Sequence, residues 1–220
     1  MRTIELGASV TLSNDLDAQA LRGKLRANGT LLVNVMSSAG AGKTTLLSAL
    51  IRALPELSIG VMEADIESDV DAVAIEALGA KAIQVHTGGM CHMDAGMTAQ
   101  AVEAMGDEHF DLLFLENVGN LICPAEYDTG AALKLMLLSV PEGDDKPLKY
   151  PLMFKESDGL VITKLDALPY FDFDLGLCTS RAQKLNPAIR IFPVSAKTGE
   201  GMEKLTDWLR AQLIDRKNEK

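Results

Sequence analysis

The chain has 220 residues, of which 47% are hydrophobic and 24% are charged, and its 31 acidic and 21 basic residues give a formal net charge of −10. This acidic balance argues against nucleic-acid binding, because neutralising a phosphate backbone requires a basic face. The apolar runs are far shorter than the roughly 18 to 20 residues that cross a bilayer, and no basic segment followed by an apolar one opens the chain. We therefore expect a cytoplasmic protein that contacts neither nucleic acid nor a membrane.

The chain carries three cysteines, Cys91, Cys123 and Cys178. So small and odd a number argues against a disulfide framework and leaves thiols available to a metal. No linker rich in proline, glycine or serine divides the chain, so we expect a single domain over residues 1–220, with residues 1–30 as an N-terminal helical extension.

Short apolar runs alternate with segments of helical spacing, which is the pattern of βαβ units around a parallel sheet. The predicted helices are Asn14 to Ala27, Thr44 to Leu54, Asp69 to Leu78, Ala95 to Met105 and Met202 to Leu213, and a frayed polar tail follows from Arg216. The predicted strands are Leu31 to Met36, Ile59 to Met62, Ala82 to Val85, Leu112 to Leu115, Leu133 to Val140, Leu160 to Thr163 and Ile189 to Val194. The fold class is α/β, with a mostly parallel central sheet of about seven strands flanked by helices. Ligands of such sheets bind beyond the carboxyl ends of the strands.

The first strand leads into Gly40-Ala41-Gly42-Lys43-Thr44-Thr45, which has the pattern of a Walker A loop and is followed by an apolar helix. The glycines allow backbone N–H groups to surround phosphate oxygens, Lys43 neutralises the β and γ phosphates, and Thr44 offers a hydroxyl to Mg²⁺. The consensus has glycine where Ser37 stands. The strand before and the helix after the loop nevertheless favour a P-loop nucleotide hydrolase over a merely glycine-rich turn.

Asp65 and Glu116 each follow a predicted strand near this loop. Either carboxylate can hold Mg²⁺ or position the attacking water, although capping a helix or turn is the alternative for both. Gly119 follows Glu116 by three residues and would let backbone N–H approach a γ-phosphate, as in a switch. Asp69 and Asp71 are ambiguous, because acidic residues are common at helix starts.

The loop after the third predicted strand contains the adjacent residues Cys91 and His92, and Cys123 lies seven residues beyond Glu116. Thiolates and an imidazole are ligands that Ni²⁺ or Zn²⁺ favours. Three ligands leave such a site incomplete, and a second copy across a two-fold axis would complete or bridge it. The alternative is that these residues are structural, as we expect for Cys178, His86 and His109, and the nearby Met90, Met93 and Met97 are expected to pack rather than to bind metal.

Between residues 141 and 155 the composition, with three prolines, indicates a rigid surface loop.

Two motifs later in the chain concern recognition of the nucleotide base. Thr163-Lys164-Leu165-Asp166 and Ser195-Ala196-Lys197 resemble the guanine-recognition motifs of GTPases, with threonine in place of the commoner asparagine. A carboxylate at Asp166 accepts from guanine N1–H and its exocyclic amine, which adenine cannot supply. We therefore expect GTP to be preferred, whereas an ATP-dependent kinase on this fold would bind ATP.

Together these motifs, with Leu115-Glu116-Asn117-Val118-Gly119-Asn120-Leu121 and the segment 142–150, resemble the HypB family over most of residues 31–200. The resemblance implies a SIMIBI-class GTPase that forms a GTP-dependent homodimer, and for such a switch we expect slow turnover. With a HypA-type nickel chaperone, such proteins help to deliver nickel to the large subunit of [NiFe]-hydrogenase. It also implies that Cys91, His92 and Cys123 form a nickel or zinc site at the dimer interface.

The urease accessory GTPase UreG is the nearest alternative, but its metal motif is Cys-Pro-His, whereas Cys91 and His92 are adjacent here. An interaction switch regulated by GTP, with structural cysteines, is the alternative from another functional class. Some HypB proteins carry an N-terminal cysteine motif or a histidine-rich stretch, but no histidine precedes His86 in this chain, so we expect no nickel-storage role. The identity and affinity of the metal, the resting oligomer and the partner's docking surface stay open.

Overall fold

The computed structural model describes residues 6–65 and 70–218, and side chains over residues 12–64 and 73–216. Seven strands form one sheet in the order β3-β2-β4-β1-β5-β6-β7, and every neighbouring pair is parallel. The strands are β1 Leu31–Ser37, β2 Ile59–Asp65, β3 Lys81–His86, β4 Leu112–Glu116, β5 Leu133–Ser139, β6 Gly159–Thr163 and β7 Arg190–Pro193. The predicted α/β class and all seven predicted strands are confirmed, and the described sheet is wholly parallel.

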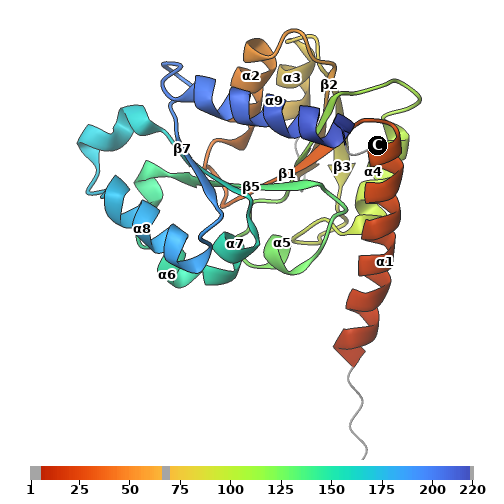
Figure 1. Cartoon of the computed structure of the whole chain (residues 1–220), viewed down its shortest axis with the longest axis horizontal. Helices are drawn as coiled ribbons and strands as arrows, with labels where there is room; N and C mark the ends of the chain where they lie inside the picture. The colour runs from red at the N-terminus through yellow and green to blue at the C-terminus, as the bar shows by residue number, and fades with distance from the viewer. Residues whose placement is uncertain (1–5, 66–69, 219–220) are drawn as a thin grey trace, which may run out of the picture.

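Helices cover both faces of the sheet (Figure 1). One face carries α2 Lys43–Ala53, α3 Val70–Glu76 and α9 Met202–Asn218. The other face carries α1 Leu6–Ala27, α4 Ala95–Ala104, α5 Cys123–Glu126, α7 Pro151–Glu156 and α8 Leu175–Leu185. Strand β1 is buried along its whole length, with Val33 and Val35 packed on the α2 side and Leu32 on the α1 and α4 side. This two-sided burial explains why β1 is predominantly apolar instead of alternating between apolar and polar residues.

The helix α1 begins at Leu6, earlier than the predicted Asn14, and packs beside α4 (Figure 1). Arg22 fixes it to the segment after α5, because the guanidinium donates to both carboxylate oxygens of Asp128 at 2.7 and 2.8 Å. Gly130 allows close approach there: with φ of 78°, a Cβ on this residue would lie 3.0 Å from Leu21 Cδ2. The N-terminal helix is thus tied to the body of the protein.

The prediction of a surface loop over residues 141–155 is wrong. This stretch forms the 3₁₀ helix η1 Val140–Glu142, then α6 Lys146–Lys149, and then α7. Each of these helices has a proline at its first or second position. The N–H groups at these positions have no partner within a helix, so a proline, which lacks the N–H, is tolerated there. The side chains of Met153 and Phe154 are fully buried beneath β5 and β6. Helices of three to six residues are too short for a periodic pattern to reveal them.

The expected frayed tail from Arg216 is also corrected, since α9 continues to Asn218 and Arg216 donates to the carbonyl oxygens of Thr30 and Arg22. Residues 219–220 lie outside the described part of the chain. Across the described helices, none is long and apolar enough to span a membrane.

Candidate nucleotide and metal site

The carboxyl ends of β1, β2 and β4 surround a cavity of about 440 Å³. It lies beside the middle strand β1, at the edge where parallel sheets bind ligands. The cavity brings together residues that were predicted separately from the Walker A loop, the Glu116 loop and the base motif. Its lining is Ala39, Gly40, Gly42, Lys43, Thr44, Thr45, Glu63, Ala64, Glu116, Asn117, Gly119 and Lys164.

The Walker A loop connects β1 to α2 and directs the amino end of α2 into this cavity. Gly40 and Gly42 have φ of 75° and 96°, a region in which only glycine is free of strain. The apolar side chains of α2 are buried against the sheet, so the helix start is held rigidly. Backbone N–H groups at a helix start, together with the helix dipole, favour a phosphate here.

The side chains of Lys43, Thr44 and Glu116 converge at the cavity. The hydroxyl of Thr44 donates toward the Glu116 carboxylate, at 3.1 Å from one oxygen and 3.3 Å from the other. The Lys43 ammonium lies 3.8 Å from the first of these oxygens. The hydroxyl and the carboxylate are hard oxygen ligands beside the expected phosphates, so this donor set fits Mg²⁺.

A second carboxylate, Glu63, lines the same cavity and was not predicted. Glu63 of β2 lies beside Glu116 of β4 in the register of the sheet, and Glu63 is 2% exposed. The available signal was a charged residue inside an apolar strand, which is costly unless it serves the site. The predicted Mg²⁺ ligand Asp65 ends β2, with its backbone beside His86 of β3. The side chains of Asp65 and Asp71 and the whole of Asp69 lie outside the described residues, so their roles stay predictions.

Gly119 lies directly against the Walker A loop. A Cβ at this position would approach within 2.9 Å of both the N and the Cα of Ala39. Only a glycine therefore allows the Glu116 loop to rest on the phosphate loop without moving it.

A second cavity, of about 260 Å³, adjoins the first and shares Gly42, Thr45 and Lys164 with it. It contains the predicted base motifs, with Asp166 on the 3₁₀ helix η2 Leu165–Tyr170. Its other lining residues are Ala41, Leu46, Thr163, Ala167, Ala196 and Lys197. The volume and its position beside the phosphate cavity suit a purine base.

Ser195 orients the carboxylate of Asp166, donating its hydroxyl at 2.6 Å. This hydrogen bond is the main reason that the pKa of Asp166 lies below its usual range, and the charge of Lys197 adds to the effect. Ser195 itself is fully buried and sits behind the cavity rather than on its lining. An ionised, fixed carboxylate is the acceptor that two guanine donors require.

Thr163 and Lys164 tie the base motif to the Walker A loop. The hydroxyl of Thr163 donates to the carbonyl oxygen of Ala41 at 2.7 Å, and the Lys164 ammonium donates to that of Gly40 at 2.7 Å. The threonine at the position of the commoner asparagine therefore still makes a hydrogen bond to the phosphate loop.

On the far side of the Glu116 loop, Cys91, His92 and Cys123 form a cluster whose ligand atoms all lie within 4.8 Å of one another. The Sγ atoms of Cys91 and Cys123 are 3.1 Å apart, and Cys91 Sγ is 3.8 Å from His92 Nδ1. Cys91 is exposed and Cys123 half-buried, whereas His92 is buried and stacks on Tyr127 with ring centroids 4.0 Å apart. Two thiols and an imidazole at these distances fit Ni²⁺ or Zn²⁺.

The pKa values of His92 and Cys123 are shifted in opposite directions. Burial lowers the pKa of His92, which favours the neutral imidazole that binds metals. The hydrogen bond with Cys91 is the main reason that the pKa of Cys123 is raised. A bound cation would favour loss of the thiol proton, so metal binding at this cluster would release protons.

Asn117 connects the two sites and was not singled out from the sequence. It directly follows Glu116, is fully buried, and accepts hydrogen bonds from the N–H groups of Met93 at 3.1 Å and Val118 at 2.9 Å. Its amide nitrogen donates to Asn34 Oδ1 of β1 at 3.1 Å. Met93 is the residue after His92, so one side chain joins the nucleotide loop to the metal loop.

Cys178, Met93 and Met97 are packed, as expected, whereas the expectation that Met90 packs is wrong because its side chain is exposed. Cys178 is fully buried in α8, and burial raises the pKa of its thiol to about 12. Met93 is buried and Met97 packs against the same apolar cluster, while Met90 is 44% exposed.

Two lysines of the segment 141–155 form ion pairs with acidic neighbours. The Lys146 ammonium lies 3.8 Å from Glu142, and the Lys149 ammonium lies 2.6 Å from Asp145. Glu142 also accepts a hydrogen bond from Ser38 of the Walker A loop.

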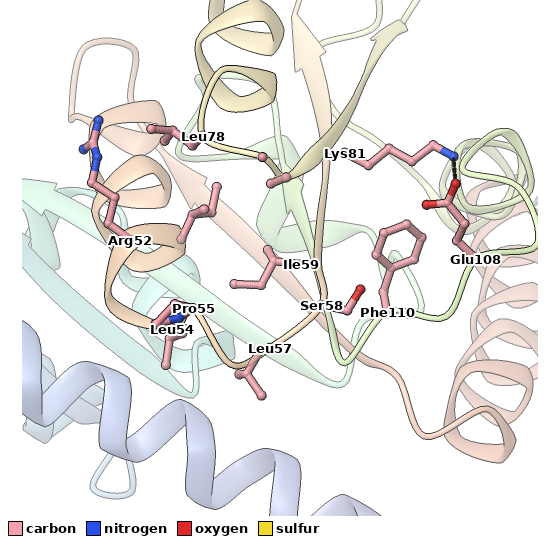
Figure 2. A pocket seen from close by; sticks show the side chains of 13 residues that line it. Arg52, Leu54, Pro55, Leu57, Ser58, Ile59, Leu78, Lys81, Glu108 and Phe110 are labelled. Atoms are coloured by element: carbon pink, nitrogen blue, oxygen red, sulfur yellow. Dashed lines mark hydrogen bonds and ion pairs between the residues drawn. The ribbon is translucent and has the colours of Figure 1, made fainter.

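Figure 2 shows another cavity, of about 390 Å³, at the opposite edge of the sheet. It opens at the amino ends of β2 and β3, near Ile59 and Lys81, and the Lys81 ammonium lies 3.0 Å from Glu108 at its rim. The motifs lie at the carboxyl ends of the strands, so this cavity is separate from the nucleotide and metal sites.

Comparison with known proteins identifies the family of the chain. Residues 31–193 match the family model described as "CobW/HypB/UreG, nucleotide-binding domain". The hydrogenase maturation factor HypB of Rhizobium leguminosarum bv. viciae is 44% identical over 216 residues, covering 98% of this chain and 72% of the relative.

Two solved structures are closely similar. HypB from Helicobacter pylori, solved in complex with nickel, superposes with a TM-score of 0.88 at 38% identity and covers 92% of this chain and 96% of that one. HypB from Archaeoglobus fulgidus gives 0.86 at 37% identity, covering 92% and 99%. The resemblance carried by the sequence motifs is confirmed. The chain belongs to the HypB hydrogenase maturation factors, a nickel-associated group within the CobW/HypB/UreG family of P-loop GTPases.

Proposed function

We propose that this protein is a GTP-hydrolysing metallochaperone, which binds nickel, or zinc, at a dimer interface and assists nickel insertion into [NiFe]-hydrogenase. The observation that carries the proposal is the contact of Asn117 with Met93, which joins the Glu116 loop of the nucleotide cavity to the Cys91–His92 loop. This contact gives a nucleotide-dependent movement of the Glu116 loop a direct route to the candidate metal ligands.

In the nucleotide site, the backbone of Gly40, Ala41, Gly42 and Thr45 surrounds the phosphates, and Lys43 neutralises their charge. Thr44 and Glu116 hold Mg²⁺, with Asp65 as a further candidate, and the cation supplies charge neutralisation at the phosphates. Asp166 selects guanine, with Thr163, Lys164, Ser195, Ala196 and Lys197 around the base. We expect slow turnover, as in a switch whose product is a change of state.

In the metal site, Cys91, His92 and Cys123 bind the cargo. The exposure of Cys91 and Cys123, in contrast to the buried Cys178, supports a metal that enters and leaves rather than a structural role. Three donors leave a coordination position for a second copy of the chain, and the exposed side chains of Met90 and Ile122 flank the cluster as a self-associating surface would.

The nucleotide site and the metal site are coupled through the Glu116 loop. Nucleotide state is sensed at Glu116 and Gly119, which contacts the Walker A loop, and Cys123 lies on the same stretch of chain. GTP closes the dimer and gathers the metal ligands, and hydrolysis releases the metal to a partner. A HypA-type nickel chaperone and the hydrogenase large subunit are the expected partners, and residues 1–220 act as one GTPase domain with residues 1–30 as its extension.

Light scattering with GDP and with a non-hydrolysable GTP analogue, each with and without Ni²⁺, tests this function. Dimers should form with the analogue, and Ni²⁺ should strengthen them. Cys91→Ala should abolish the nickel effect and keep the nucleotide effect, while Cys178→Ala, which leaves all three ligands in place, should retain both. Monomers in all four conditions would contradict the coupled dimer, and unchanged metal stoichiometry in Cys91→Ala would contradict the metal site.

A further inference from the structure

The candidate metal site is built from two separate segments of the chain. Cys91 and His92 lie in the loop before α4, whereas Cys123 is the first residue of α5. Neither segment belongs to the sheet, so their separation must be fixed by other contacts. On the nucleotide side, Asn117 holds Met93, and Asn120 donates to the carbonyl oxygen of Cys91 at 3.3 Å.

On the other side, a single side chain of α1 contacts both segments. The Oδ1 atom of Asn14 accepts a hydrogen bond from the N–H of Ala95, the first residue of α4, at 2.9 Å. Its Nδ2 atom donates to the carbonyl oxygen of Asp128 at 2.9 Å. Ala95 follows Cys91 by four residues, and Asp128 follows Cys123 by five. Asn14 therefore bridges the two metal-bearing segments.

The chemistry of this bridge requires a carboxamide. One partner is a backbone donor and the other a backbone acceptor, so the side chain must accept at one atom and donate at the other. A carboxylate keeps only the acceptor, and an apolar side chain keeps neither. The N–H of Ala95 is one of the groups at a helix start that has no partner within the helix, so Asn14 also completes the hydrogen bonding of α4.

The position of Asn14 is fixed by the helix that carries it. Ala18 and Leu21 are buried on the same face of α1, one and two turns further along, and Leu21 touches the position of Gly130. The contact of Arg22 with Asp128 holds the helix against the segment that Asn14 binds. The matched family model begins at residue 31, so α1 lies outside it.

We propose that Asn14 is a positioning residue for the metal site, because it sets the separation between the Cys91–His92 loop and the segment that follows Cys123. This inference rests on the proposed metal-binding function. Asn14 contacts no cargo itself. It acts by limiting how far the two halves of the ligand set move apart, as residues behind metal ligands do elsewhere.

The test compares Ni²⁺ affinity and the thiolate-to-nickel absorption of the full chain with those of Asn14→Ala and Asn14→Asp. The exposed amide Gln19 on the same helix supplies the control variant Gln19→Ala. We expect Asn14→Ala to weaken Ni²⁺ binding by about 10-fold, the lower end of what residues behind the ligands contribute. The absorption per bound nickel should shift toward that of Cys123→Ser. Asn14→Asp should fall between, because it keeps the bond to Ala95 and loses the bond to Asp128.

Affinity for GDP should be unchanged in every variant, which shows that each is folded. Wild-type affinity and spectrum in both Asn14 variants would overturn the inference, as would an equal loss in Gln19→Ala. If Cys91→Ala and Cys123→Ser bind nickel normally, the proposed function fails together with this inference. If those two variants lose nickel and the Asn14 variants do not, the inference alone fails.

Discussion

The carboxamide oxygen of Asn117 lies 3.1 Å from the backbone nitrogen of Met93, 24 residues away along the chain. Asn117 follows Glu116, whose carboxylate contacts Thr44, and Met93 follows His92. A displacement of the Glu116 loop by nucleotide therefore acts on the metal loop through this hydrogen bond, through the bond from Asn120 to the carbonyl oxygen of Cys91, and through the covalent connection from Glu116 to Cys123.

Replacing Asn117 by alanine should uncouple the two sites. In the wild type, Ni²⁺ affinity should differ between the GDP form and the form with a non-hydrolysable GTP analogue, and in Asn117→Ala this difference should shrink. The variant also leaves buried groups without a partner, which costs about 1–3 kcal/mol of unfolding free energy. Ni²⁺ titration in each nucleotide state measures the coupling, and Asn120→Ala tests the second contact of the same loop, the bond to the carbonyl oxygen of Cys91. A nucleotide effect as large as in wild type would show that coupling runs through another route.

Base selection should depend on the charge of Asp166. Asp166→Asn loses an acceptor for the guanine donors, so GTP affinity should fall by about 10- to 100-fold, as expected for a hydrogen bond to a charged group. Xanthine carries a carbonyl where guanine has its amine, and the new side-chain amide donates to it. Calorimetry with GTP, ATP and xanthosine triphosphate should show the preference move to the last. Undiminished GTP affinity in the variant would remove Asp166 from the base site.

Two carboxylates in one phosphate cavity repel an anionic ligand until a cation is bound. Glu63→Gln removes one of them, so affinity for GDP without Mg²⁺ should rise by about 10-fold, the effect of roughly 1.4 kcal/mol. The gain in affinity on adding Mg²⁺ should be smaller than in wild type. Nucleotide titrations with a chelator and with Mg²⁺ measure both quantities. The exposed variant Glu108→Gln, at the opposite edge of the sheet, should change neither.

The strands and the phosphate loop were predictable because the signal is local. A strand such as β1, buried on both faces, is a predominantly apolar run, and a Walker A loop needs its glycines and Lys43 in a fixed order. The site residues that escaped prediction depend on distant contacts. Glu63 acquires its place from the register of β2 with β4, and Asn14 from the docking of α1. The charge of Glu63 inside an apolar strand was a local signal, but neither the strand register nor the docking of α1 leaves a pattern in neighbouring residues.

The helices between residues 140 and 156 escaped for a different reason. Each spans too few residues to show a helical period, and their prolines suggested a loop although proline also begins helices. Their packing over β5 and β6 buries Met153 and Phe154, which a composition argument cannot anticipate.

The docking of α1 should weaken in acid. Burial by itself raises the pKa of Asp128, but the hydrogen bonds from Arg22 and from the Gly130 N–H outweigh it, and the net pKa lies below the usual value. A lowered carboxyl pKa in the folded state adds stability above the unfolded-state pKa of about 3.9, and this is lost as pH falls through the folded-state value. Arg22→Gln should therefore cost about 1 kcal/mol at pH 7, since the pair is partly exposed. Urea unfolding at pH 7, 5 and 3 should show the difference between wild type and variant become smaller at the lowest pH, and a constant difference would contradict this account.

The three thiols should separate by reactivity. Cys91 is exposed and Cys123 half-buried, whereas Cys178 is fully buried with its pKa raised to about 12, so almost none of it is thiolate at neutral pH. An aromatic disulfide reagent should modify two thiols of the native protein and reach the third only after unfolding in denaturant. Ni²⁺ or Zn²⁺ should protect the two reactive thiols, and Cys91→Ala should leave one reactive thiol with weaker protection. Rapid reaction of all three native thiols would contradict the burial of Cys178, and an absence of protection by either metal would remove the chemical basis for treating Cys91 and Cys123 as ligands of a cargo.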